Sequence, residues 1–355
     1  MSEQATENTT AIAAHGASQL TSVSVDAYNA ELKEKGGFIG DKASRRAFRA
    51  IIEGWRKRLR ERGEDPLGDT DEDITQLDLD KILFEGDPSS GGLILGAVEE
   101  FSQEFVRVIR RFLRVKEWQD TQRIVVGGGF CSSRVGQLAI GRAGNILKAD
   151  KYDLELCSIR NDPDQAGLIG CIHLAPPWIF GGHDSILAVD IGGSNIRVGI
   201  VSINAKKDPT LAKSKVIMSE VWAHSVDEPT RDVAIEQLIA MLLTMIKRAT
   251  RENLHLAPFV GIGCPGLITA DGSIEKGGQN LPGNWELKRF NLPNLLREAI
   301  PMIDGNELSV LMHNDAVVQG LSEAPFMQDV QRWGVMTIGT GLGNARFTNR
   351  QLESK

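Results

Sequence analysis

The chain has 355 residues, of which 41% are hydrophobic and 25% are charged, and its formal net charge is −7. This length allows two domains or lobes with substantial cores, and the composition is that of a soluble globular protein. The negative net charge argues against nucleic-acid binding as the main task, although it does not exclude a nucleotide site.

The cysteines and the start of the chain bear on localisation. The four cysteines are scattered without a C-x-x-C pair, which favours reduced thiols in an intracellular protein and argues against a Cys-rich zinc site. The first residues lack the charged and apolar regions of a secretory signal, and no apolar run reaches membrane-spanning length. We therefore expect a cytoplasmic protein that binds neither membranes nor nucleic acid.

The N-terminal region predicts a tail followed by a basic helix. Residues 1–35 show little periodicity and are expected to form a flexible tail, whereas residues 42–62 have the apolar spacing of an amphipathic helix. The arginines of this helix could contact nucleic acid or the phosphates of ADP, but such a row is more often a solvated helix face. Residues 63–75 are acidic, contain Gly and Pro, and predict a loop.

The middle of the chain alternates helices and strands up to a clear linker. The pattern predicts helices at 96–115, 134–148 and 165–174, strands at 123–130 and 154–159, and a Pro-Pro and Gly-Gly linker at 175–184. The first of these strands runs into the triple-glycine turn Gly127, Gly128 and Gly129.

Residues 187–201 predict a β-hairpin with a glycine-rich tip. Two apolar runs flank the turn Gly192-Gly193-Ser194-Asn195, and Asp190 ends the first run. Glycines at the tip let backbone amides approach an anion closely, so the hairpin is a candidate phosphate loop. No Gly-Lys-Ser/Thr follows and the next element is a strand, which excludes a Walker loop and a dinucleotide fingerprint. An ordinary hairpin with a tight turn is the alternative interpretation.

The remaining elements complete an α/β pattern. A helix is predicted at 232–252 and strands at 259–264, 308–313 and 335–338. These strands lead into a Pro-Gly turn, into Asn314-Asp315 and into a glycine turn over 339–343, respectively. Strands alternating with long helices indicate the α/β class.

Three glycine turns and one Asn-Asp pair thus lie at strand ends, which is a set suited to phosphoryl transfer. That reaction depends on positioning and charge neutralisation. Two amide-lined turns can grip the β- and γ-phosphates, a third can accommodate the adenosine, and a carboxylate can accept the proton of the acceptor hydroxyl.

These segments resemble the motifs of the sugar-kinase, Hsp70 and actin superfamily. Asp190–Ser194 looks like its first phosphate motif, Gly339–Gly343 like its second, and Gly127–Gly129 like its adenosine motif. More narrowly, the segments at 166–170, 263–266, 280–285 and 314–316 are similar to the ROK family of sugar kinases and repressors. The resemblance covers about residues 95–347. It implies a two-lobed actin-like ATPase (ribonuclease H-like) fold and a glucokinase-like, ATP-dependent carbohydrate kinase.

The resemblance also implies roles for individual residues. Asp315 would be the catalytic base for a hydroxyl of a hexose or hexose-like sugar, and Asp190 would hold Mg²⁺, through water. The substrate side would comprise Asn314, Asn280, Asn284 and Gly266. ATP would contact Gly192, Gly193, Ser194, Asn195, Gly339, Thr340, Gly341, Gly343, Gly127, Gly128 and Gly129. The alternatives are helix capping or a structural hydrogen bond for Asp315 and a plain turn role for Asn280 and Asn284.

The order of these motifs departs from the family, because the adenosine-like turn precedes the first phosphate motif. A circular permutation, with the old termini joined by the linker at 175–184, is the simplest explanation. A broken gene fusion whose half-domains complement another chain is the alternative. The expected parts are a tail (1–35), a nucleotide-side lobe (36–165 plus 316–355), a linking segment (166–184) and a smaller lobe (185–315).

The sequence after Gly343 is a second departure. It shows neither the Glu-x-Gly-His segment that completes the family's sugar site nor the Cys-rich zinc motif, so we expect no zinc. A non-catalytic sugar or nucleotide sensor is therefore the second hypothesis, and an ATPase of the actin or Hsp70 type is the third. The resemblance further implies a homodimer.

Overall fold

The computed structural model describes residues 13–35, 37–68, 74–203 and 208–350. The chain is a mixed α/β protein that divides into two compact units. Unit 1 comprises Met1–Ser24, Leu168–Leu321 and Arg350–Lys355, and unit 2 comprises Val25–Gly167 and Ser322–Asn349. No helix within the described ranges is long and apolar enough to cross a membrane.

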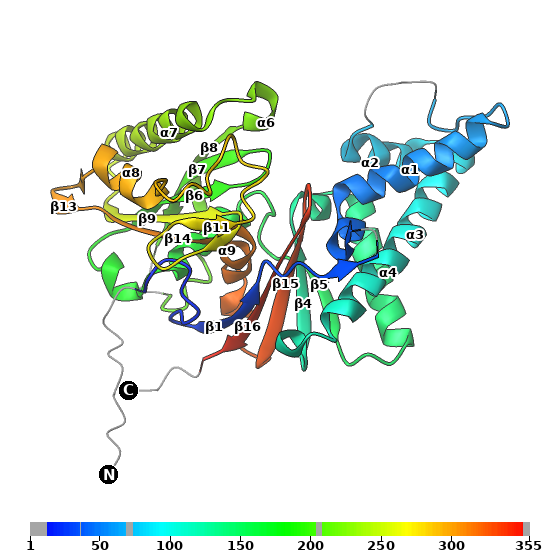
Figure 1. Cartoon of the computed structure of the whole chain (residues 1–355), viewed down its shortest axis with the longest axis horizontal. Helices are drawn as coiled ribbons and strands as arrows, with labels where there is room; N and C mark the ends of the chain where they lie inside the picture. The colour runs from blue at the N-terminus through cyan, green and yellow to red at the C-terminus, as the bar shows by residue number, and fades with distance from the viewer. Residues whose placement is uncertain (1–12, 36, 69–73, 204–207, 351–355) are drawn as a thin grey trace, which may run out of the picture. The chain divides into compact units, whose positions relative to one another are not determined.

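Unit 1 is built on a five-stranded sheet with the order β14-β9-β6-β7-β8 (Figure 1). The strands are β6 (Ser185–Ile191), β7 (Ile196–Ser202), β8 (Val216–Trp222), β9 (Leu256–Cys264) and β14 (Ser309–Asn314). β6 is parallel to β9, and β9 to β14, whereas β6, β7 and β8 form an antiparallel meander. The predicted hairpin at 187–201 and the strands at 259–264 and 308–313 are confirmed.

Different residues cover the two faces of this sheet. On one face, the apolar side chains of β6, β7 and β9 pack in a single core with α7 (Arg231–Arg251) and α8 (Leu292–Ala299). On the other face the 3₁₀ turn η4 (Cys171–His173) and the helix α9 (Asp315–Leu321) approach strand glycines. A Cβ on Gly261 would lie 2.6 Å from the Cβ of Cys171, so this position admits no side chain. The helix predicted at 232–252 is confirmed as α7.

Several short elements complete unit 1. They are α6 (His224–Asp227), β10 (Leu267–Ile268), β11 (Ile274–Lys276), β12 (Met302–Ile303) and β13 (Asn306–Glu307). The small-residue helix expected at 165–174 consists of α5 (Ala166–Gly170) followed by η4, and the expected linker contains the turn η5 (Pro177–Phe180).

Unit 2 contains a second five-stranded sheet, with the order β1-β16-β15-β4-β5. Its strands are β1 (Val23–Tyr28), β4 (Arg123–Gly127), β5 (Glu155–Ser158), β15 (Arg332–Ile338) and β16 (Leu342–Asn349). β15 is parallel to β4, and β4 to β5, whereas β15 and β16 form an antiparallel hairpin. The strands expected at 123–130, 154–159 and 335–338 are confirmed, although the first ends at Gly127.

Four helices and several short elements accompany this sheet. The helices are α1 (Arg45–Arg60), α2 (Gln76–Glu85), α3 (Pro88–Phe112) and α4 (Arg134–Ala149). The short elements are β2 (Lys33–Glu34), β3 (Gly37–Phe38) and the 3₁₀ turns η1 (Ile39–Ala43), η2 (Lys116–Trp118), η3 (Gly129–Ser132) and η6 (Ala324–Phe326). The helices expected at 42–62, 96–115 and 134–148 are confirmed. α3 begins eight residues earlier than expected, because Asp87 caps it and Pro88 occupies its first position.

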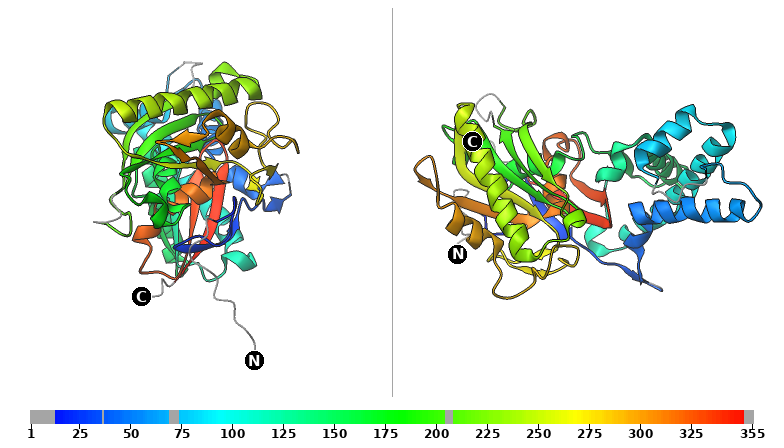
Figure 2. Two further views of the ribbon diagram at one scale, coloured as in Figure 1. Left: turned by 90° about the vertical axis from the view of Figure 1, so that its left-hand side faces the viewer. Right: turned by 90° about the horizontal axis from the view of Figure 1, so that it is seen from above.

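The two sheets have the same strand order. In each, a central strand (β6 or β15) has an antiparallel hairpin partner on one side and two parallel strands on the other. The outer strand of the meander is β8 in unit 1 and β1 in unit 2, so in unit 2 it comes from the opposite end of the chain (blue beside red in Figures 1 and 2). Residues 23–28, which lie in the segment expected to be a flexible tail, therefore form part of a sheet. Nothing local in six residues reveals that pairing.

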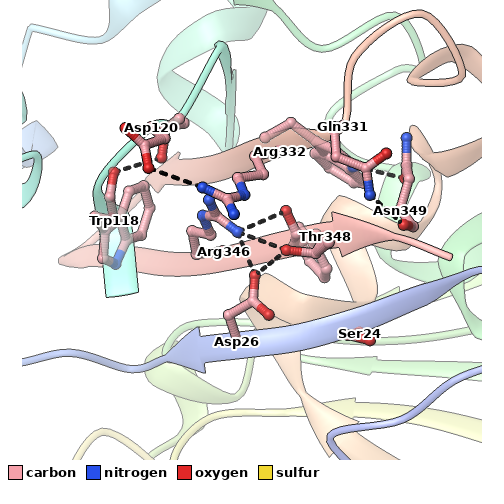
Figure 3. Close-up of polar contacts among 12 residues, drawn as sticks. Ser24, Asp26, Trp118, Asp120, Gln331, Arg332, Arg346, Thr348 and Asn349 are labelled. Carbon is pink, nitrogen blue, oxygen red and sulfur yellow. Dashed lines mark hydrogen bonds and ion pairs between the residues drawn. The ribbon is translucent and has the colours of Figure 1, made fainter. Parts of the chain in front are cut away.

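An ion pair whose arginine is buried holds β1 to β16 (Figure 3). The Arg346 side chain is 4% exposed, and it pairs with the carboxylate of Asp26 on β1, whose side chain is 28% exposed. Arg346 Nη1 also donates to Thr348 Oγ1 at 2.8 Å, and Thr348 Oγ1 donates to Asp26 at 2.7 Å. At the two ends of the pairing, the Asn29 amide donates to Asn344 O at 2.9 Å and the Arg350 amide donates to Ser22 O at 3.0 Å. These bonds make β1 antiparallel to β16.

We expect Asp26→Ala to lower the free energy of unfolding by about 1.5–3 kcal/mol, because it removes a charged hydrogen-bond partner of the buried Arg346 guanidinium. Urea unfolding followed by circular dichroism measures this loss.

Arg332→Ala is the matched control. Arg332 and Asp120 form an ion pair of 2.8 Å in the same sheet region, but their side chains are 46% and 78% exposed. Arg332→Ala is expected to lower the free energy of unfolding by at most about 1 kcal/mol. Equal losses in the two variants would contradict the anchoring role of Asp26.

Candidate active site

Two carboxylates lie at the same edge of the unit 1 sheet. Asp190 is the penultimate residue of β6, and Asp315 begins α9 directly after β14. β9 lies between these strands, and its Gly263 is paired with Asp190 on one side and with His313 on the other. Because all three strands are parallel, their carboxyl ends meet at one edge of the sheet.

Gly263 determines how closely the groups around it approach. A Cβ on Gly263 would lie 3.6 Å from Asp190 Oδ1 and 3.3 Å from the Cβ of Val318 in α9. Asp190 therefore points to the sheet face that α9 covers. The sequence alone placed Asp190 and Asp315 at strand ends, and the structure points Asp190 to the sheet face covered by α9, the helix that Asp315 begins.

The environment of Asp315 disfavours its charged form. Burial, and next the negative charge of Asp190, raise the pKa of the Asp315 carboxyl to about 7, although hydrogen bonds such as that from the Ala316 amide at 2.9 Å act in the opposite direction. A carboxyl with a pKa near neutrality is suited to act as a general base at physiological pH. Asp190 also has a cationic neighbour, since Arg197 Nη1 lies 3.6 Å from its Oδ2.

Asn314 is buried and fixes the start of α9. Its Oδ1 accepts the amides of Ala316 at 3.0 Å and Val317 at 3.3 Å, and its Nδ2 donates to Gly266 O at 3.0 Å. The capping role that sequence reasoning considered for Asp315 is thus performed largely by Asn314. Gly266 has φ +104°, and a Cβ there would lie 2.6 Å from Lys276 O. The sugar contacts predicted for Asn314 and Gly266 stay predictions.

The hairpin tip between β6 and β7 is held in a defined shape. The Gly192 amide donates to Asn195 O at 2.8 Å, and the Ser225 amide donates to Ser194 O at 3.2 Å. The His224 ring is 2% exposed, and its Nε2 lies 2.9 Å from Gly192 O. Sequence reasoning missed His224, because it belongs to a four-residue helix 32 positions away and carries no motif.

The two predicted sugar-side asparagines differ in their surroundings. A Cβ on Gly193 would lie 3.1 Å from the Cβ of Asn280, so this exposed asparagine lies against the hairpin tip. Asn284 instead supports a turn, since its Oδ1 accepts the Glu286 amide at 2.9 Å and its backbone oxygen accepts from Arg231 at 3.0 Å. The structure therefore brings Asn280 to the tip and shows a turn role for Asn284.

The other predicted nucleotide residues form a second group, in unit 2. Gly127 at the end of β4 is paired with Thr337 of β15. Gly128 has φ +82°, and a Cβ there would lie 2.5 Å from Ile338 O, so the two glycine turns lie side by side. Within the second turn, which includes Thr340, the Gly339 amide donates to Gly341 O at 2.9 Å. Gly343 follows on β16, opposite Thr337.

Two glycines of this second group, Gly341 and Gly129, have open space where a side chain would lie. A Cβ on Gly341 would meet no atom within 4 Å, and one on Gly129 would meet only Arg45 Nη1, at 3.7 Å. Packing of the protein itself therefore does not require glycine at these two positions. Glycines at such turns allow a ligand to approach the backbone closely.

The two carboxylates of unit 1 suit a magnesium ion that is held partly by the protein and partly by the phosphates of a substrate. Mg²⁺ retains several waters and is usually bound by one or two carboxylates together with substrate phosphates. Asp190 and Asp315 supply carboxylates whose mutual repulsion a cation would relieve. Two carboxylates are therefore a donor set that suits a Mg²⁺ ion bound together with substrate phosphates.

We expect Asp315→Asn to stabilise the metal-free protein increasingly as the pH rises. The folded-state pKa of Asp315 lies above its ordinary value, so the stability contributed by its protonated form is present near pH 4 and is lost as the pH rises through about 7. Urea unfolding in EDTA at pH 4 and pH 8 should show the variant gaining about 2–4 kcal/mol over the parent between these pH values. A difference that does not change with pH would contradict this electrostatic description of the site.

Comparison with known proteins matches one segment of the chain. Residues 186–354 match the ROK family, and this segment includes Asp190, Asp315 and Gly339–Gly343 but not Gly127–Gly129. A glucokinase of Thermotoga maritima is 27% identical over 169 residues, which are 47% of this chain and 45% of that protein. The chain thus spans about half the length of the curated relative it matches. The family resemblance is confirmed for this segment.

Solved structures of sugar kinases also match part of the chain. A sugar kinase described as putative, from Cytophaga hutchinsonii, is 21% identical, with 46% of this chain and 48% of that chain covered and a TM-score of 0.35. A ROK hexokinase from Thermus thermophilus is 21% identical, with 48% and 49% covered and a TM-score of 0.33.

Proposed function

We propose, starting from the ROK-family match of residues 186–354, that the protein is an ATP-dependent sugar kinase. It transfers the γ-phosphoryl group of Mg·ATP to a hydroxyl of a hexose or hexose-like sugar. The observation that carries this proposal is the pair of interacting carboxylates within the matched segment, Asp190 beside Gly263 and Asp315 at the start of α9, with the pKa of Asp315 raised to about 7.

Each residue of the site has a distinct task in this reaction. Asp315 accepts the proton of the attacking sugar hydroxyl, and its near-neutral pKa leaves it basic enough to do so. Asp190 would hold Mg²⁺ through water, and the ion would neutralise phosphate charge. Asn280, next to the hairpin tip, would border the sugar.

The glycine turns bind the nucleotide in this proposal. Amides of the hairpin tip and of the turn at 339–341 bind phosphates, and the turn at 127–129 accommodates the adenosine. The open positions at Gly341 and Gly129 support this assignment, because a side chain there would take up space that the nucleotide needs.

We extend the proposal to the fold, as a circularly permuted, two-lobed actin-like ATPase. The identical strand order of the two sheets supports two related lobes. The contribution of β1 from the far end of the chain supports a permutation, because it completes a meander that would otherwise be continuous in sequence. Each sheet is formed by five strands of this one chain, which favours a permutation over half-domains that complement another protein. A zinc-free, cytoplasmic homodimer remains a prediction.

A turnover assay tests the proposed reaction. The full chain is given Mg·ATP and a panel of hexoses, amino sugars and cyclitols, and ADP release is followed. We expect sugar-dependent turnover whose kcat falls by about 10²–10⁴-fold in Asp315→Asn, since the variant lacks the base.

Asp232→Asn provides the control, because this side chain in unit 1 is 80% exposed and pairs only with its neighbour Arg231 among the described residues. Its kcat should remain within about twofold of the parent value, as for surface substitutions elsewhere. Turnover that survives in Asp315→Asn would refute the role of Asp315. ATP binding without turnover on any sugar would favour the non-catalytic sensor.

A further inference from the structure

We propose that His313, the penultimate residue of β14, is a positioning residue that holds the start of α9 in place for the reaction. Through Asn314 it links the proposed base, Asp315, to the N-terminal segment His15–Ala17 of unit 1. The inference rests on the proposed function, because it concerns the orientation of the proposed base. It adds to that function a segment outside the part of the chain that matches the ROK family.

The segment His15–Ala17 covers one edge of the unit 1 sheet. Within the described residues, β14 is the outermost strand on this side of the sheet. The outward backbone groups of such a strand need hydrogen-bond partners from outside the sheet when water does not reach them. The Gly16 amide donates to Met312 O at 3.0 Å, and the Met312 amide donates to His15 Nδ1 at 3.1 Å. These two bonds attach the segment to β14 two residues before Asn314.

The His313 ring extends this contact to the end of the strand. The residue is 1% exposed, its Nδ1 accepts the Asn314 amide at 2.7 Å, and its Nε2 lies 3.2 Å from Ala17 O. Because Nδ1 accepts, the proton of the neutral ring lies on Nε2, which donates to Ala17 O. Burial lowers the pKa of His313 to about 4, so the ring keeps this neutral form at physiological pH. One side chain therefore joins the N-terminal segment to the backbone of Asn314.

Asn314 transmits this constraint to the proposed base. Its Oδ1 accepts the amides of Ala316 at 3.0 Å and Val317 at 3.3 Å, so its side chain caps the helix that begins with Asp315. The His313 ring holds the backbone of Asn314, and the side chain of Asn314 holds the first turn of α9. A rotation of the Asn314 backbone would therefore move Asp315. A misplacement of about 1 Å can lower a reaction rate about 10²-fold.

Gly16 allows the N-terminal segment to be displaced without altering His313. It has φ +57°, and a Cβ there would lie 2.2 Å from Ile268 O of β10. A side chain at this position would therefore push the segment away from β14. Gly305, between β12 and β13, has φ +78°, but no atom lies within 4 Å of the position of its Cβ. Gly16→Val and Gly305→Val thus share the backbone strain and differ in the steric clash.

Sugar-dependent turnover of the full chain tests this inference, with each variant made in the parent and in Asp315→Asn. We expect His313→Ala to lower kcat about 10–100-fold in the parent, because the base loses its fixed orientation. The same substitution should change kcat less than about twofold in the Asp315→Asn background, since a positioning residue has no effect without the base that it positions. The KM for ATP should stay within about twofold in both backgrounds.

Three further variants separate the two bonds of the His313 ring. His313→Asn retains an acceptor at the position of Nδ1 and should recover part of the kcat that His313→Ala loses. Gly16→Val should lower kcat at least about fivefold, because it moves Ala17 away from the ring. Gly305→Val is its control and should leave kcat within about twofold of the parent value.

The same measurements distinguish a positioning role from general damage to the fold. A parent-like kcat in His313→Ala would overturn the inference. Losses of equal size in the two backgrounds would also overturn it, because they would indicate a purely structural role. If His313→Ala does not fold, Gly16→Val in the two backgrounds decides by the same comparison. A parent chain without sugar-dependent turnover would instead refute the proposed function itself, and this inference with it.

Discussion

The close approach of helix α9 to the unit 1 sheet is the constraint on which the rest of the site depends. It requires glycine at 263, where a side chain would press on both Asp190 and Val318. Because that position is empty, α9 begins at the edge of the sheet, and Asp315 lies near enough to Asp190 for the two charges to interact. Packing and acid–base chemistry are therefore set by the same missing side chain.

Unit 2 also depends on a glycine at a close contact, but there the glycine packs against a backbone carbonyl. Gly128 meets the carbonyl of Ile338, which brings the ends of β4 and β15 together and places their two turns side by side. The strand order matches that of unit 1, but the residues at the strand ends differ in chemical character. Carboxylates lie at the edge of the unit 1 sheet, whereas the turns of unit 2 have open glycine positions. In the proposed kinase, the carboxylates would serve the acceptor hydroxyl and the open glycines the nucleotide.

Local pattern was sufficient to predict the central elements and the two carboxylates. Alternating apolar residues predicted β6 and β7, and the residues after β14 identified Asp315. Features that depend on distant pairing were not predictable. A short strand such as β1 does not specify its partner by itself, and its anchor joins Asp26 to Arg346 across 320 residues. His224 was missed for the same reason, since it contacts a turn that is remote in sequence.

The pairing of β1 with β16 also has a consequence for how the protein is made. The partner of β1 is synthesised some 320 residues after β1 itself. At typical translation rates this interval lasts about 15–60 s, during which the strand has no native neighbour and is open to mispairing or chaperone capture. The unit 1 sheet is encoded within residues 185–314 and can form earlier. Unit 2 is therefore expected to become native only after β16 has been synthesised.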